Sequence, residues 1–360
     1  MKKAAIIVTS VLMLLAFSAC GDSAPTSNEI TETETTNEDK PVVATAIKDD
    51  SNGKIIDKDG EYTLTGEING QVLVTAENVT LILDGVTITC ADDSAILGKD
   101  GTSITQNLTV QLNGHNVING GKHGIQGKDN LIITGAGTAN ITAVKDGLHA
   151  GDSLTVEGGN INVLASYEGF EAPSILISGG VSTIHATDDG VNAAVDDGDT
   201  TVPIIKITGG ETIVYCFSDA IDSNGTLDIT GGTVLLFVGE TRDGETIDTD
   251  RGATLTPALF GTGSINAGAT LAVNDRSFTV EENAVKYALI IPDLIDGQSY
   301  AVTVDGADFA TITASSAVQG GMPTGFGGRG GGTRADKGFP ADGSFTPSEG
   351  GGFTKPGKPA

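Results

Sequence analysis

The feature that most constrains the fold of this chain is a repeat of about 22 residues. Short apolar-alternating segments such as Leu154–Gly159 and Ile205–Gly210 end in a Gly-Gly pair, and an acidic-Gly-apolar-polar motif follows about ten residues later. A period of about 22 residues is typical of one coil of a parallel β-helix, in which each coil contributes about three short strands. Aligned on its apolar residue, the motif defines an anchor column spaced 23, 22, 21, 30 and 26 residues apart: Ile125, Leu148, Phe170, Val191, Ile221 and Ile247.

Two further columns support this register. Seven residues before each anchor the sequence has a β-branched residue, in the order Ile118, Ile141, Val163, Ile184 and Val214. Five residues before each anchor the residue is small, in the order Gly120, Ala143, Ala165, Ala186 and Cys216. A narrow core needs such columns, because like side chains stack on like side chains between coils about 4.8 Å apart.

The columns therefore predict an all-β, single-domain parallel β-helix, or solenoid. An antiparallel sandwich is the rival fold, but it would not keep columns in register over six coils. Because a solenoid must blunt its ends, we expect one cap over residues 46–70 and another over residues 278–314.

Polar residues flank the anchor on both sides. One column lies two residues before it and the other lies one residue after it, and the residue directly before the anchor is usually glycine, which permits a sharp bend. The earlier column contains His123, Asp146, Glu168, Asp189, Asp219 and Glu245. The later column contains Gln126, His149, Glu171, Asn192, Asp222 and Asp248.

Stacking makes these columns two ladders of oxygen ligands. Carboxylates about 4.8 Å apart repel one another, and Ca²⁺ relieves the repulsion because it accepts six to eight oxygen ligands of irregular geometry. The alternative is a solvated acidic face with Asx-type turns. Zinc is disfavoured, since His123 and His149 lack clustered Cys or His partners in the sequence.

A third column contains aromatic residues. His185 and Tyr215 lie six residues before their anchors, with Tyr167 in the neighbouring column, and strand alternation turns the first two outward. These three residues are candidate ligand-binding residues, because an exposed strip of rings could stack on sugar rings. Equally, the terminal segments could cover the strip.

The ends of the chain differ from its body. Residues 1–19 resemble a lipoprotein signal peptide, with Lys2 and Lys3 before the apolar run Ala4–Phe17 and Cys20 as the expected lipidation site. The alternative is an ordinary secretory signal that is cleaved at Ala19. Residues 20–46 are polar and should form a disordered tether, and residues 319–360 should form a disordered Gly/Pro-rich tail. The β-helix is expected over residues 47–318, with Cys90 and Cys216 as buried free thiols several coils apart.

The net charge is −27. Such an acidic chain is a poor partner for nucleic acid or an anionic membrane surface, so we expect contact with the membrane only through the lipid anchor. Hard divalent cations are the partners that a field of carboxylates favours.

Four motifs give the chain a family resemblance. Lys145–Ala150, Tyr167–Glu171, Asp188–Ala194 and Asp219–Ser223 resemble the calcium-binding, carbohydrate-binding β-helix proteins typified in clostridia. The resemblance implies a right-handed β-helix similar in shape to pectate lyases, calcium at the turns, and an acidic plant polysaccharide such as polygalacturonate as the partner. It carries a calcium role onto the matching residues Asp146, Glu168, Glu171, Asp189, Asn192, Asp219 and Asp222. Ala220 stands where the motif has glycine.

The leading functional hypothesis is a monomeric, non-catalytic, calcium-dependent carbohydrate-binding protein, exported and lipid-anchored to the outward face of the bacterial membrane. A calcium-dependent polysaccharide lyase is the second hypothesis, and it needs a basic residue such as Lys145 to remove a proton beside the uronate carboxylate. The third is a structural surface protein or adhesin whose calcium only stabilises the fold.

Overall fold

A computed structural model describes residues 48–50, 53–99, 105–196, 198–240 and 244–317. The predicted signal peptide with Cys20, the tether and the Gly/Pro-rich tail lie outside the described residues. Every regular element among the described residues is a β-strand. None of them forms a helix long and apolar enough to cross a membrane.

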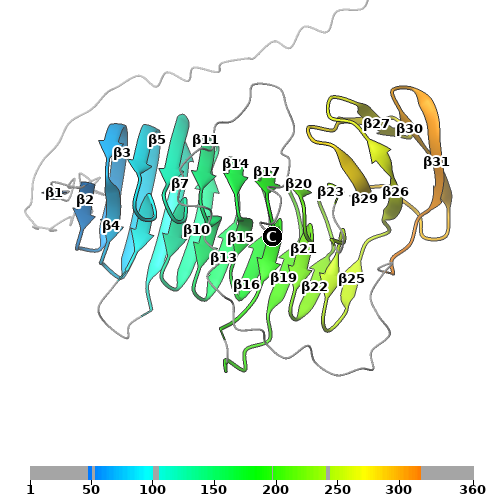
Figure 1. The fold of residues 1–360 in the computed structure, drawn as a ribbon. Helices are drawn as coiled ribbons and strands as arrows, with labels where there is room; N and C mark the ends of the chain where they lie inside the picture. Colours follow the sequence, from blue (N-terminus) through cyan, green and yellow to red (C-terminus); the bar gives the residue numbers. More distant parts are fainter. Residues whose placement is uncertain (1–47, 51–52, 100–104, 197, 241–243, 318–360) are drawn as a thin grey trace, which may run out of the picture. The chain divides into compact units, whose positions relative to one another are not determined.

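Nine strands pair side by side, all parallel, in one sheet (Figure 1). They are β2 (Gly53–Ile56), β4 (Gln71–Val74), β6 (Ile96–Gly98), β9 (Ile125–Gly127), β12 (Asp146–Ala150), β15 (Glu168–Glu171), β18 (Val191–Ala193), β21 (Ile221–Ser223) and β24 (Asp248–Thr249). A short strand, β1 (Lys48–Asp50), pairs antiparallel with β2. Because consecutive members of the sheet are about one repeat apart in sequence, the chain returns to the same sheet once per repeat.

Between two visits to this sheet, the chain adds two further parallel strands. One series is β7 (Asn107–Asn113), β10 (Asn130–Gly135), β13 (Ser153–Val156), β16 (Ser174–Ile177), β19 (Ile204–Ile207), β22 (Thr226–Ile229) and β25 (Ala253–Leu255). The other is β8 (His115–Gly120), β11 (Thr138–Ala143), β14 (Asn160–Ser166), β17 (Val181–Ala186), β20 (Glu211–Cys216) and β23 (Thr233–Val238). The long strands β3 (Gly60–Asn69) and β5 (Asn78–Cys90) pair with each other, and β5 pairs with both series. The pairing therefore gives a β-helix-like stack of coils.

The predicted register of the anchor column is confirmed. Leu148 pairs with both Ile125 and Phe170, Phe170 pairs with Val191, and Val191 pairs with Ile221. These side chains are buried in one continuous apolar core, together with the β-branched column of the third strand series.

The small column departs from the prediction at one coil. Strand β14 bulges after Val163, so that Leu164 projects to the surface with 48 % of its area exposed and Ala165 pairs with Thr142. Ser166, instead of Ala165, then occupies the column and pairs with Ala186. A bulge adds one residue to one strand only, and a count from the anchor alone cannot detect it.

The Gly-Gly pairs mark a tight turn between the second and third strand of a coil. The second glycine of the pair has a φ between 76° and 83° in three coils, at Gly180, Gly210 and Gly232. Residues with an L side chain rarely adopt this conformation. A Cβ atom at any of the three would also lie 2.7 Å from the carbonyl oxygen of the corresponding glycine one coil earlier. Both the turn and the close stacking of coils therefore require glycine here.

The first end of the stack differs from the expected cap. We expected residues 46–70 to form a cap over the first coil. Instead, β2 and β3 pair in parallel with the next coil and belong to the repeat. In this first coil Lys54 stands at the anchor position. The next two coils have Val72 and Ile96 as anchors, and Leu73 and Leu97 stand where later coils have a polar residue. Without the acidic-Gly motif, the sequence gives no sign of these coils.

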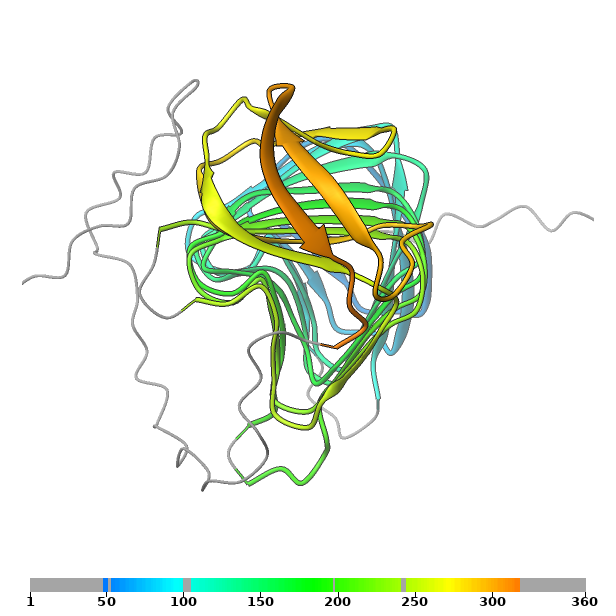
Figure 2. The same cartoon turned by 90° about the vertical axis from the view of Figure 1, so that its right-hand side faces the viewer.

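The last coil is covered by the C-terminal strands. Strand β29 (Ala284–Ile290) pairs antiparallel with β23 and with β26 (Leu259–Ile265), so the parallel edge ends there. The strands β27 (Thr270–Val273), β28 (Arg276–Thr279), β30 (Ser299–Val304) and β31 (Ala307–Thr313) form a separate antiparallel sheet. Seen along the stack, these strands cross the end of the overlaid coils (Figure 2). A second apolar cluster joins the cap to Tyr215, Leu235 and Phe237 of the last coils, and Tyr287 and Leu271 are fully buried in it.

The two described cysteines are free thiols, as predicted. Cys216 is buried, and burial raises the pKa of its thiol well above the ordinary value. Cys90 is only partly buried at the end of β5.

Candidate functional site

The two predicted polar columns are present in the structure. Asp146 pairs with Glu168 in the first column, and in the second His149 pairs with Glu171, Glu171 with Asn192, Asn192 with Asp222 and Asp222 with Asp248. The columns run along β12, β15, β18 and β21, at and next to the turn that enters each strand. Stacking in register therefore brings side chains together that lie about one repeat apart in the sequence.

Half of the side chains in the two columns are buried. Asp146 is 3 % exposed and Glu168 is 1 % exposed, and Glu171, Asp189 and Asn192 are also buried. Burial of so many carboxylates disfavours the alternative of a solvated acidic face, because a buried charge needs a compensating partner.

The glycines directly before the anchors have a different role from the one expected. None of Gly124, Gly147, Gly169 and Gly190 has a positive φ, so the bend there does not depend on glycine's conformational freedom. Instead there is no room for a side chain: a Cβ atom at Gly169 would lie 2.2 Å from the carbonyl oxygen of Gly190. Ala220 replaces the glycine in a later coil and is fully buried.

Two clusters of carboxylates result from the stacking. In one, a carboxylate oxygen from each of Asp146, Glu168 and Glu171 lies within 4.8 Å of the others. In the other, Glu168 meets Asp188 and Asp189 within the same distance. Glu168 is common to both, and Asp188 was not among the residues predicted from the sequence. Both clusters offer oxygen atoms only, which is the donor set that Ca²⁺ prefers.

Asn192 adds an uncompensated oxygen beside these clusters. Its Nδ2 donates a hydrogen bond of 3.1 Å to Oε2 of Glu168. Its Oδ1 is buried and has no hydrogen-bond partner among the described residues. A buried acceptor without a donor costs about 1–3 kcal/mol, so this atom is placed as the ligand of a cation would be.

Asp189, Asp219 and Asp222, which we call the aspartate end of the columns, repel one another. Burial, with the nearby Asp189 charge, raises the pKa of Asp219 to about 7 and that of Asp222 to about 8. Neither Asp219 nor Asp222 joins the tight clusters found among the described residues. Two of these carboxylates also support the backbone: Oδ1 of Asp189 accepts from the amide of Asp219, and Oδ1 of Asp219 from that of Glu245.

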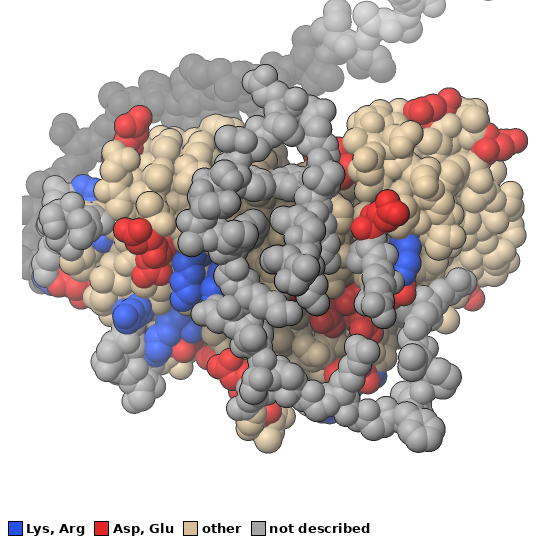
Figure 3. Space-filling model, in the orientation of Figure 1, with Lys and Arg blue, Asp and Glu red and all other residues tan. Residues whose placement is uncertain are grey.

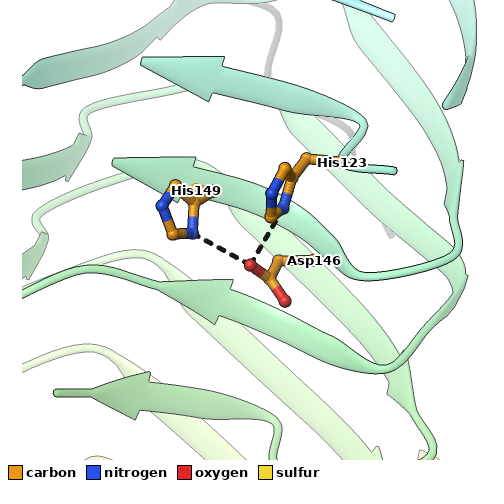
Figure 4. A group of neighbouring side chains, drawn as sticks. All are labelled: His123, Asp146 and His149. Atoms are coloured by element: carbon orange, nitrogen blue, oxygen red, sulfur yellow. Dashed lines mark hydrogen bonds and ion pairs between the residues drawn. The ribbon is translucent and has the colours of Figure 1, made fainter. Parts of the chain in front are cut away.

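The other end of the columns contains histidines. His123, Asp146 and His149, which we call the histidine end, meet at one carboxylate oxygen (Figure 4). Nδ1 of His123 and Nδ1 of His149 each lie 2.9 Å from Oδ2 of Asp146. The ring centroids are 4.5 Å apart. The prediction that the two histidines lack a clustered histidine partner is therefore wrong, since adjacent coils bring them together.

Charge compensation is the rule at the histidine end. Burial alone would raise the pKa of Asp146, but the contacts with His123 and His149 outweigh it and hold the pKa well below its usual range. Burial opposes the charge on His149 as well, yet the contacts with Asp146 and Glu171 raise its pKa to about 9. His123 differs, because burial lowers its pKa.

The predicted aromatic strip is not an exposed surface. Tyr215 is 3 % exposed, and its ring stacks between those of His185 and Phe237 at centroid distances of 5.0 and 5.1 Å. The cap covers it: its hydroxyl donates to the carbonyl of Thr279 and accepts from the amide of Glu281. The prediction of outward alternation was correct within the coil, but it could not include the cap that packs on that face.

His185 attaches the same face to the cap. Its Nδ1 contacts Oε1 of Glu282 and its Nε2 lies 3.3 Å from Oε2 of Glu281. Burial lowers the pKa of His185, and the hydrogen bonds with both glutamates outweigh that effect and raise it to about 9. Tyr167 also stays partly exposed, and burial together with a hydrogen bond to Asp188 raises its pKa.

The fold and the polar columns define a class of protein: an all-β, parallel-stranded protein with carboxylate clusters at its turns. The sequence matches the family described as carbohydrate-binding domain-containing protein over residues 50–317, and the chain therefore belongs to that family. No curated protein matches the sequence.

One solved structure is similar to this chain. It is the "polysaccharide lyase-like protein from C. thermocellum", determined as a gadolinium derivative, with 26 % sequence identity and a TM-score of 0.51. The match covers 57 % of this chain and 88 % of the other. Both comparisons agree with the predicted resemblance to carbohydrate-binding proteins.

Proposed function

We propose that this chain is a non-catalytic, calcium-dependent binder of acidic polysaccharide such as polygalacturonate, built as a right-handed parallel β-helix. The observation that carries the proposal is the buried pair of all-oxygen clusters centred on Glu168. Membership of the carbohydrate-binding family supports a polysaccharide as the partner. The calcium and the acidic nature of the glycan are the parts of the proposal that go beyond the family description.

The polar columns fit calcium in three respects. Their donors are carboxylate and amide oxygens, Oδ1 of Asn192 is a buried acceptor without a partner among the described residues, and coils about 4.8 Å apart let one ion bridge two of them. A hard trivalent cation is present in the similar structure from C. thermocellum, a gadolinium derivative. The residues that would hold calcium here are Asp146, Glu168, Glu171, Asp189, Asn192, Asp219 and Asp222.

Calcium would let an acidic protein bind an acidic glycan. The chain has a net charge of −27, so a polyuronate would be repelled unless cations stood between the two sets of carboxylates. On the face drawn in Figure 3, most of the basic side chains gather over the earlier coils, whereas acidic side chains occur along the whole stack. Lys99 and Lys122 lie in the turns of the earlier coils and would attract the glycan directly. Tyr167, partly exposed beside Glu168, would stack on a sugar ring.

A polysaccharide lyase is the second candidate, because the similar structure is named polysaccharide lyase-like. A lyase would need a basic side chain close to the bound calcium, and Lys145 directly precedes Asp146. Calcium that serves stability alone is the third candidate, since Asp189 and Asp219 also hold backbone amides of the next coil.

Titration calorimetry of the full chain with polygalacturonate, in calcium and in chelator, tests the proposal. We expect binding in calcium only, no binding of an uncharged glucan, and no rise in the ultraviolet absorbance of unsaturated uronates. Such a rise would instead identify the lyase. Calcium uptake without any glycan binding would support the purely structural candidate and contradict the proposal.

Two variants locate the ions. Asp189→Asn should weaken both calcium binding and glycan binding, because it removes a ligand of the cluster at Glu168. Asp92→Asn is the matched control, since Asp92 is an exposed aspartate of an earlier coil and should leave both unchanged. Equal effects of the two variants would exclude the polar columns as the calcium site.

We also propose that the chain is exported and anchored to the outward face of the membrane through a lipid on Cys20, and that it acts as a monomer. Metabolic labelling with a fatty acid should modify the wild-type chain and leave the Cys20→Ala variant unlabelled. Labelling of both chains, or of neither, would contradict the anchor.

A further inference from the structure

The histidine end differs from the rest of the polar columns in its donor atoms. The clusters around Glu168 offer oxygen alone, whereas His123, Asp146 and His149 offer two imidazole nitrogens and one carboxylate oxygen. Asp146 and His149 come from β12, and His123 lies in the turn before β9 in the preceding coil. One strand, and the turn that leads into its neighbour in the same sheet, therefore hold the three side chains.

The spacing of these atoms suits a small ion with short bonds. Both Nδ1 atoms lie 2.9 Å from Oδ2 of Asp146, and Nδ1 of His149 lies 3.3 Å from Oε2 of Glu171. In a tetrahedral site with bonds of about 2.0–2.1 Å, neighbouring donor atoms are about 3.3 Å apart. The two distances to Oδ2 are a few tenths of an ångström shorter than this value, and all three donor atoms lie within 4.8 Å of one another.

His123 supplies an independent sign of a missing ligand. Its side chain is 5 % exposed, and although its Nδ1 is near Asp146, the nitrogen has no aligned hydrogen-bond partner among the described residues. A buried ring nitrogen without a hydrogen bond is costly, because burial removes water without replacing it. A metal ion between His123 and His149 would satisfy it.

The donor set selects the class of ion. Calcium and magnesium prefer oxygen ligands, whereas two imidazoles with one carboxylate are typical of zinc and related divalent transition metals. We propose that His123, Asp146 and His149 form a binding site for a divalent transition-metal ion of the zinc class, next to the carboxylate cluster at Glu168 and sharing Asp146 with it, with Glu171 or water as the fourth ligand. An ion can reach it from the side of His149, whose side chain is 25 % exposed.

Zinc titration of the untagged full chain, in saturating calcium and with a competing chelating dye, tests this site. We expect one zinc ion per chain to bind in the presence of excess calcium. Failure to bind zinc, or complete displacement of zinc by calcium, would overturn the proposal.

Variants assign the ligands. His123→Gln and His149→Gln should each weaken zinc binding at least about tenfold, a typical loss when a metal site is disturbed. His115→Gln is the matched control, because His115 is an exposed histidine whose ring forms a hydrogen bond with Asn140 and lies outside the clusters of possible metal ligands found among the described residues. The His115→Gln variant should bind zinc with the same affinity as the wild type. An equal loss of zinc affinity in all three variants would contradict the assignment.

A spectroscopic measurement on the wild type avoids any question of whether the variants fold. Copper(II) replaces zinc at sites of this class, and its electron paramagnetic resonance spectrum shows splitting from each bound nitrogen. Splitting from two imidazole nitrogens is the expected result. A spectrum without nitrogen splitting would mean an all-oxygen site and would overturn the proposal.

Discussion

The histidine end and the aspartate end lie in the same stacked columns of one parallel sheet. They differ in whether neighbouring charges attract or repel one another. At the histidine end, opposite charges meet, so the pKa of Asp146 is held below its usual range. At the aspartate end, like charges meet, and the pKa values of Asp219 and Asp222 rise to about 7 and about 8. The comparison shows that the repeat sets where polar side chains stack, while the residue types decide whether stacking stabilises the fold.

Removing the shared carboxylate should affect stability most. Asp146→Ala removes the buried carboxylate that both His123 and His149 contact, and loss of one member of a buried charged group costs about 3–5 kcal/mol. Denaturant unfolding measures this loss, with Asp92→Ala as an exposed control that changes stability by less than about 0.5 kcal/mol. A loss below about 1 kcal/mol would show that the histidine end is not held by this carboxylate.

The apolar anchors beneath the two ends should not distinguish them. Ile125 lies beside the histidine end and Ile221 beside the aspartate end, and both are buried. Ile125→Ala and Ile221→Ala should each lower the free energy of unfolding by about 2–5 kcal/mol, and by amounts within about 1 kcal/mol of each other. Thermal and denaturant unfolding measure both values. A much larger loss at one end would mean that the ends differ in packing as well as in charge.

In chelator, stability should fall as the pH rises. Asp219 and Asp222 have raised pKa values, so the folded chain retains protons that the unfolded chain releases above about pH 4, and the fall extends to about pH 8. His149 and His185, with pKa values of about 9, stabilise the fold below about pH 6.5 and lose that effect as the pH rises through about 9.

Calcium should separate these two contributions. Saturating calcium should remove the contribution of the aspartates, which accounts for the fall between about pH 4 and 6.5 and for part of the fall up to about pH 8. The contribution of the histidines, between about pH 6.5 and 9, should remain. Unfolding curves over this pH range measure both. A pH profile in chelator that is flat up to about pH 6.5 would contradict the repulsion at the aspartate end.

Replacing one aspartate of the aspartate end by asparagine should have the smallest effect on stability, and it should raise stability where the other substitutions lower it. Asp222→Asn removes one of the repelling charges without changing the size of the side chain, so it should raise stability in chelator at pH 8 by about 1 kcal/mol. The same substitution should reduce the stabilisation by calcium. Loss of stability in chelator would mean that Asp222 is held by favourable contacts instead.

Much of the register of the coils could be predicted from the sequence, because each column can be recognised by its own spacing and by the apolar character of its residues. The spacing of Leu148, Phe170 and Val191 alone predicted their pairing, which the structure confirms. The bulge at Leu164 could not be predicted, because a one-residue insertion leaves the pattern on both sides intact. The coils before Ile125 were also missed, since their anchors lack flanking acids.

The candidate site was predicted less completely, because it depends on contacts between columns. Glu168 and Glu171 were identified from their column positions, and the structure places both in a cluster with Asp146. The proximity of His123 and His149 was missed, since they stand in different columns of adjacent coils and meet only diagonally. The burial of Tyr215 depends on a cap that is more than sixty residues further along the chain.

The most direct test of the account is thermal unfolding of the full chain in calcium and in chelator, compared between the wild type and Asp189→Asn. Binding to the folded state should raise the apparent stability of the wild type by about 2.7 kcal/mol at a hundredfold excess of calcium over its dissociation constant. The variant should show a much smaller rise. A wild-type unfolding curve that calcium does not shift would contradict the central claim that the polar columns bind calcium.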